Sequence, residues 1–129
     1  MISPSIRAFA VATALTAGTI CSASSTAHAQ AQFNGNWSVV IYTRSGSCDP
    51  SYRYGLSIYN GVVSGGGGAS FSGRVTRSGA VSVLVSSGGQ SARGSGRLSV
   101  DRRGNGRGSG SWRGSGSQGN CSGSWAASR

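Results

Sequence analysis

Apolar and polar positions alternate with a period of two along most of the chain after residue 30. In residues 37–43, Trp37, Val39 and Ile41 fall on one side, and in residues 52–58 every second residue is again apolar. This is the pattern of a half-buried β-strand, because successive side chains of a strand point to opposite faces. Weaker versions of the same alternation predict further strands over 71–76, 81–85, 92–100, 107–113 and 121–125.

Turn signals separate these segments at short intervals. Asn60-Gly61 predicts a type I′ hairpin turn. Ser78-Gly79 predicts a further turn, and Gly88-Gly89 closes the hairpin that follows it. The run Gly65–Gly68 is interpreted as a flexible loop. The predicted fold class is therefore all-β, a small antiparallel meander of seven to eight strands that forms either a barrel or a sandwich.

The last third of this meander carries the weakest signal. Residues 101–120 are so rich in glycine that a flexible tail is the alternative to a strand there. The ordered interpretation depends on Trp112 and Trp125, whose rings are expected to fill the space that neighbouring strand glycines leave.

Residues 1–29 have the features of a signal peptide. Arg7 supplies a positive start, residues 8–20 form a short apolar stretch, and Ala27-His28-Ala29 resembles a small-residue cleavage site. The apolar stretch is too short and too often broken by threonine for a membrane span. We therefore expect an exported protein, periplasmic or secreted, with residues 30–129 as a single β domain.

The exported domain contains two cysteines, Cys48 and Cys121. An even number of cysteines in an exported chain predicts a disulfide bond. If the first strand pairs with the last, the end of the first, near Cys48, meets the start of the last, near Cys121. The bridge would then join the two strands that close the barrel.

The composition limits the chemistry of this domain. The chain of 129 residues has 12 basic residues against 2 acidic ones, and the only histidine, His28, lies in the signal segment. Residues 30–129 contain no lysine, glutamate or methionine. Their only acidic residues are Asp49 and Asp101, which we interpret as turn residues. General acid–base catalysis, nucleophilic triads and transition-metal sites all need side chains that are scarce or lacking here. We expect no enzyme, no metal and no cofactor.

Arginine is the strongest remaining signal. The alternation predicts that arginines on several strands point outward and, with two in a turn, form one basic face. Guanidinium groups bind carboxylate, sulfate and phosphate through paired hydrogen bonds. The face comprises Arg74, Arg93, Arg97, Arg102, Arg103, Arg107 and Arg113. The alternative interpretation is that this basic face only keeps the protein soluble.

Two short motifs resemble known proteins. Phe33-Asn34-Gly35-Asn36-Trp37, an F-x-G-x-W, resembles the first strand of calycin barrels such as lipocalins, avidins and bacterial metalloprotease inhibitors. With the terminal C-x-G-x-W of Cys121, Gly123 and Trp125, the chain also resembles short exported proteins of Gram-negative bacteria. Some of these carry a haem-utilisation label, but the exported domain has no histidine or methionine to ligate haem iron.

The sequence thus favours a non-enzymatic, exported binding module for an anionic polymer or an acidic protein surface, such as polysaccharide or lipopolysaccharide. Nucleic acid is not the expected partner, and the oligomeric state is left open. The alternative function is a calycin-like small-ligand binder or protease inhibitor. It would act through the N-terminal segment or through a barrel mouth near Phe33, Trp37 and Trp125.

Overall fold

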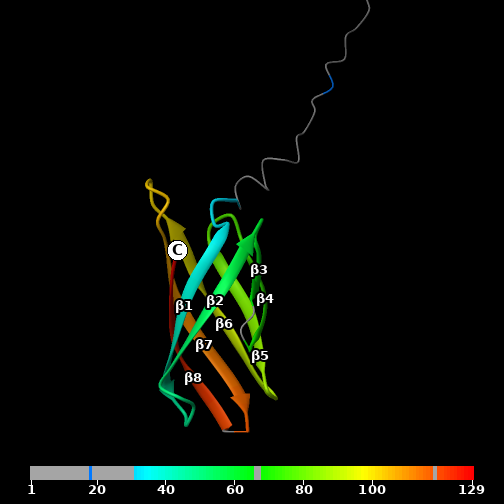
Figure 1. Ribbon diagram of the computed structural model, residues 1–129, viewed down its shortest axis with the longest axis vertical. Coiled ribbons are helices and arrows are strands. Elements are labelled where there is room, and N and C mark those ends of the chain that lie inside the picture. The colour runs from blue at the N-terminus through cyan, green and yellow to red at the C-terminus, as the bar shows by residue number, and fades with distance from the viewer. Residues whose placement is uncertain (1–17, 19–30, 66–67, 118) are drawn as a thin grey trace, which may run out of the picture.

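The protein forms a closed antiparallel β-barrel of eight strands in a computed structural model that describes residues 18, 31–65, 68–117 and 119–129 (Figure 1). The predicted signal peptide lies, apart from Gly18, outside the described residues. The strands are β1 (Gly35–Ser45), β2 (Ser51–Tyr59), β3 (Val62–Gly65), β4 (Ser70–Val75), β5 (Ala80–Ser87), β6 (Gln90–Val100), β7 (Gly106–Gly116) and β8 (Gly119–Ser128).

Each strand pairs with the next one in the sequence, and β1 pairs with β8 to close the barrel. In this closing pair, Val39 lies opposite Ala127 and Ile41 opposite Trp125, with a register shift between Thr43 and Ser45. Closure removes the two free edges that an open meander would expose. Of the two predicted architectures, the barrel is confirmed and the sandwich is wrong.

Two of the predicted turns have positive φ angles at both central residues. Asn60 and Gly61 both have positive φ angles, 47° and 80°, as a type I′ turn requires. This turn leads into β3. The strand has only four residues, which is too short a segment for its alternation to predict it from the sequence. Gly88 and Gly89 have φ angles of 55° and 82° and join β5 to β6 in the same manner.

The glycine-rich segment is a strand and not a flexible tail. β7 pairs along its length with β6 on one side and β8 on the other. The ring of Trp125 covers two of the glycines, since a Cβ atom at Gly96 or Gly110 would lie 2.6 or 2.7 Å from it. The predicted aromatic cover is therefore confirmed for Trp125, and the tail alternative is wrong.

Trp112 makes a contact that the sequence does not predict. Its indole N–H donates a hydrogen bond to the carbonyl oxygen of Tyr42 on β1, at 2.9 Å. Gly123 of β8 lies between them, opposite Trp112 on one side and Thr43 on the other. Trp112 thus spans β8 and fastens β7 to β1, because Gly123 has no side chain in the way.

The disulfide bond joins Cys48 and Cys121, whose Cα atoms are 6.1 Å apart. Cys48 lies three residues after the end of β1, and Cys121 lies near the start of β8. The predicted pairing, and its position at the seam between the first and last strands, are confirmed.

One end of the barrel is plugged by side chains. Phe33, Trp37 and Val75 are the most deeply buried large residues, with exposed fractions of 2 %, 2 % and 1 %. The Trp37 indole N–H donates to the carbonyl oxygen of Phe33, at 2.8 Å, and so ties the segment before β1 to the first strand. This closed end lies at the top of Figure 1, near the C-terminus and the β6–β7 turn.

Candidate functional site

The barrel contains an apolar cavity of about 130 Å³. Its deep part is formed by core residues such as Trp37, Ile58 and Leu98. Its lining extends to Cys48, Gln90 and the glycines beside the β7–β8 turn, which lie at the end opposite the plug. The β1–β2, β5–β6 and β7–β8 connections lie together at this end of the barrel (Figure 1). The barrel is thus a cup whose floor is the plug and whose mouth lies among these connections.

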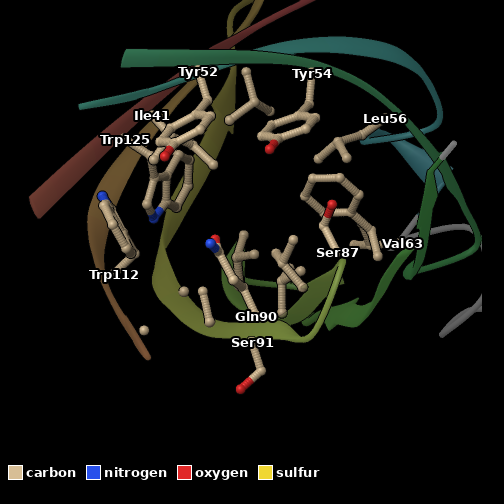
Figure 2. A pocket seen from close by; sticks show the side chains of 18 of the residues that line it. Ile41, Tyr52, Tyr54, Leu56, Val63, Ser87, Gln90, Ser91, Trp112 and Trp125 are labelled. Carbon is tan, nitrogen blue, oxygen red and sulfur yellow. The ribbon is translucent and has the colours of Figure 1, made fainter. Parts of the chain in front are cut away.

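Aromatic rings form much of the cavity wall. Figure 2 shows Tyr52, Tyr54 and Trp125 around the opening. The Tyr54 ring packs edge-on against Phe71, with centroids 5.0 Å apart, and lies almost parallel to Tyr52 at 6.3 Å. The Trp125 indole N–H donates to the carbonyl oxygen of Ser95, at 3.1 Å. These contacts hold the wall in one arrangement before any ligand enters.

Several polar groups at the mouth already have partners. The Tyr52 hydroxyl oxygen accepts a hydrogen bond from the backbone N–H of Asp49, at 3.1 Å. The Ser87 hydroxyl donates to the carbonyl oxygen of Gly68, at 2.9 Å. These two groups therefore maintain the rim of the mouth.

Two other polar groups point into the cavity. Figure 2 shows the Tyr54 hydroxyl and the Gln90 amide directed toward its centre from opposite sides. Within the described part of the chain neither group has a hydrogen-bond partner in the protein. Both are half-buried and line a space whose other walls are largely apolar. They can therefore bond to a polar atom of a molecule in the cavity.

Burial raises the pKa of the Tyr54 hydroxyl above its usual value of 10.0, and the nearby Tyr52 raises it further. Tyr54 is therefore protonated at neutral pH and offers a hydrogen-bond donor. Gln90 offers both a donor and an acceptor. None of the residues that line the cavity carries a charge.

Sequence reasoning placed the candidate pocket near Phe33, Trp37 and Trp125. Trp125 lines the wall and Trp37 the deep part of the cavity, whereas Phe33 is not among the lining residues. Phe33 and Trp37 lie at the plugged end of the barrel and not at its mouth, because the chain before β1 folds over that end and is fastened there.

Sequence reasoning missed Tyr54 and Gln90 as site residues. In the sequence, Tyr54 is one of the alternating apolar residues of 52–58, and Gln90 lies outside the predicted strand 92–100. The alternation does contain a signal for Gln90. It is a polar residue at the start of β6, two residues before Ala92 and four before Gly94, so its side chain points to the inner side of the sheet as theirs do. The structure brings both residues to one mouth although they lie on β2 and β6.

The structure places the seven arginines of the predicted basic face on the exterior. Four lie on adjacent strands: Arg93 and Arg97 on β6, and Arg107 and Arg113 on β7. Arg102 and Arg103 occupy the turn between them. Arg74 lies apart from this group, because it is on β4 and β5 runs between β4 and β6.

The two carboxylates occupy connections between strands. Asp101 accepts hydrogen bonds from the backbone N–H groups of Arg103 and Asn105, each at 2.9 Å. The bond from Asn105 is the main cause of the lowered pKa of Asp101, and the bond from Arg103 and the charge of Arg107 add to it. Asp49 lies in the β1–β2 loop, where its carbonyl oxygen accepts a bond from the Thr43 hydroxyl.

Among the described residues, no group of three or more histidine, cysteine or acidic side chains is placed to hold a metal ion. The same residues include no helix of sufficient length and hydropathy to cross a bilayer.

Comparison of the chain with protein-family models, with curated proteins and with solved structures gives no match.

Proposed function

We propose that this protein is a non-enzymatic binding protein whose barrel cavity takes up an uncharged, apolar group of a small molecule. The observation that carries the proposal is the cavity of about 130 Å³, which has a plugged floor and a lining without charged side chains. Apolar pockets with a few convergent polar groups are typical of small-molecule sites.

The size of the cavity indicates the size of the group. A cavity of about 150 Å³ lined by aliphatic and aromatic side chains holds benzene in an otherwise unrelated protein. The present cavity therefore suits one six-membered ring or a short aliphatic chain. A larger ligand would place the remainder of its structure outside the mouth.

The lining favours a ligand that is uncharged where it is buried. Burial of an ion without a charged partner is strongly unfavourable, whereas a single hydroxyl can be satisfied by one or two hydrogen bonds. Tyr54 and Gln90 supply those bonds at the mouth. A ring or short chain with one hydroxyl or carbonyl group matches this arrangement.

Export is part of the same proposal. The signal-like segment 1–29 supports it, and the disulfide bond between Cys48 and Cys121 is of the kind that forms in oxidising compartments. The protease-inhibitor alternative would act partly through an N-terminal segment that includes residues outside the described chain.

The test uses p-cresol, a one-ring molecule with one hydroxyl group, titrated into the oxidised protein. Binding is followed through the NMR signals of the Trp112 and Trp125 indole N–H groups, which belong to cavity-lining residues. We expect saturable shifts of both signals. Absence of shifts up to the solubility limit of p-cresol would contradict the proposal.

A matched pair of variants locates the site. Ala92→Phe adds a ring to the cavity wall, and Ser95→Phe adds the same ring to the exposed outer side of the same strand. Ala92→Phe should abolish p-cresol binding, whereas Ser95→Phe should retain it. Equal binding by the two variants would place the p-cresol site outside the cavity.

A further inference from the structure

Six arginines follow the outer side of the β6–β7 hairpin and form what we call the arginine row: Arg93, Arg97, Arg102, Arg103, Arg107 and Arg113. All six are exposed. The hairpin strands have 11 residues each, which corresponds to a length of roughly 35 Å. The row is therefore much longer than any single small anion.

The register defines the spacing of the charges. Arg93 and Arg113 lie directly opposite each other across the two strands. Arg97 follows four residues along β6, roughly 13 Å away. Arg107 lies opposite Ser99 and leads to the two arginines of the turn. The positive charges thus form a line from near the cavity mouth to the closed end.

Little negative charge on the hairpin compensates this line. Asp101 is the only acidic residue from Gln90 to Gly116. Its carboxylate is already bonded to backbone N–H groups of the turn. Like charges directly opposite each other on a sheet destabilise it, so the Arg93–Arg113 pair weakens the free barrel. An anion between the two guanidinium groups would remove that repulsion.

The side chains between the arginines indicate which kind of polyanion fits. The outer positions of β6 and β7 that are not arginine are all serine: Ser91, Ser95, Ser99, Ser109, Ser111 and Ser115. Serine hydroxyls donate and accept hydrogen bonds, as sugar hydroxyls do. Arginine forms paired bonds to carboxylate and sulfate groups.

The same surface lacks what single-stranded nucleic acid and membranes use. The outer positions of β5, β6, β7 and β8 include no aromatic residue on which bases could stack. Leu84 is their only large apolar side chain. Insertion into a lipid surface needs a broader apolar area than one leucine.

We propose that the arginine row binds a linear acidic polysaccharide, with carboxylate or sulfate groups paired to the arginines and sugar hydroxyls bonded to the serines. This site is distinct from the cavity, because the row is on the outer side of the sheet and the cavity on the inner side. A polymer along the hairpin would engage several arginines at once, which raises its affinity above that of the separate sugars.

The test measures binding of the oxidised protein to alginate, a polyuronate, and to dextran sulfate, with uncharged dextran as the control polymer. Titrations are made at about 0.15 M salt, where weak surface attraction is largely screened. We expect alginate or dextran sulfate to bind and dextran not to bind. Failure of both acidic polymers to bind at this salt concentration would overturn the proposal.

Two double variants with the same loss of charge distinguish a site from net charge. Arg93→Ser with Arg113→Ser removes the opposed pair of the row, whereas Arg53→Ser with Arg74→Ser removes two exposed strand arginines outside it. The first variant should weaken binding about tenfold or more, and the second by about twofold. Equal losses would mean that only total charge matters and would overturn the proposal.

Two further measurements complete the test. Circular dichroism shows whether the double variant Arg93→Ser with Arg113→Ser folds. If it does not fold, the double variant Arg97→Ser with Arg107→Ser takes its place, and it too should weaken binding about tenfold or more. A DNA oligonucleotide that binds more tightly than both polysaccharides through the same arginines would overturn the choice of partner. Ala92→Phe should leave alginate binding unchanged, so failure of the cavity proposal and failure of this one are separable.

Discussion

The guanidinium carbon of Arg129 lies 5.3 Å from the centre of the Trp37 ring. The same guanidinium donates hydrogen bonds to the carbonyl oxygens of Gln32 and Asn34, each at 2.8 Å, and of Gly104, at 2.7 Å. Arg129 therefore joins the segment before β1, the first strand and the β6–β7 turn. It secures the closed end of the cup.

Arg129→Ala should lower the stability of the barrel by about 2 kcal/mol, since charge-assisted hydrogen bonds and a cation–π contact are lost together. For a domain of this size that corresponds to a fall in the thermal midpoint of roughly 10 °C. Arg77→Ala, which removes an exposed arginine of the β4–β5 turn, should change the midpoint little. An equal fall in both variants would refute the role of Arg129.

The disulfide bond closes a sequence separation of 73 residues. Its removal should cost up to about 4 kcal/mol on the loop-entropy model. Cys48→Ala and Cys121→Ala should lower the thermal midpoint equally, and a reducing agent should have no further effect on either variant. Unequal effects would mean that one cysteine stabilises the fold in another way.

Gly123 lies in β8 at the point that Trp112 spans. A Cβ atom there would overlap the carbonyl oxygen of Tyr42 and lie 3.0 Å from the backbone nitrogen of Arg44. Gly123→Ala should therefore destabilise the β1–β8 pair by about 1–3 kcal/mol, which urea unfolding would measure. Ala126→Ser, at an exposed position of the same strand, is the control and should be nearly neutral.

The polar groups at the mouth should contribute to ligand selection. The wild-type protein should bind p-cresol more tightly than p-xylene, which has a methyl group in place of the hydroxyl. Tyr54→Phe should reduce this preference by roughly 2- to 10-fold, the contribution of one hydrogen bond, and leave p-xylene binding unchanged.

Gln90→Leu is expected to act in the same direction. If both variants keep the wild-type preference, the cresol hydroxyl does not contact the mouth groups, and the assignment of Tyr54 and Gln90 fails.

The stability of the barrel at acidic pH should depend on Asp101. Because its pKa is lower in the folded state than the ordinary 3.8, its contribution to stability is present above that value. It is lost as the pH falls through the folded-state pKa. Urea midpoints at pH 5 and pH 2 should differ less for Asp101→Asn than for the wild type. If the difference is the same in both proteins, groups other than Asp101 cause the loss of stability in acid.

The sequence by itself indicated the strands other than β3, the direction of their side chains and the disulfide bond. Alternation between Trp37 and Thr43, or between Ala92 and Val100, is a local property, because each strand residue faces opposite to its neighbour. The turn at Asn60-Gly61 was equally local, since few residue pairs adopt two positive φ angles. The outward direction of the arginines followed from the same alternation.

Only the tertiary structure decided which end of the barrel is open and which residues meet there. Closure depends on contacts between distant segments, such as Arg129 with Gln32 and Trp112 with Tyr42. Alternation places Tyr54 and Gln90 inside the barrel, but it does not bring them to the same cavity from opposite sides. Such proximity is set by the register of all eight strands together, which no single segment of the sequence contains.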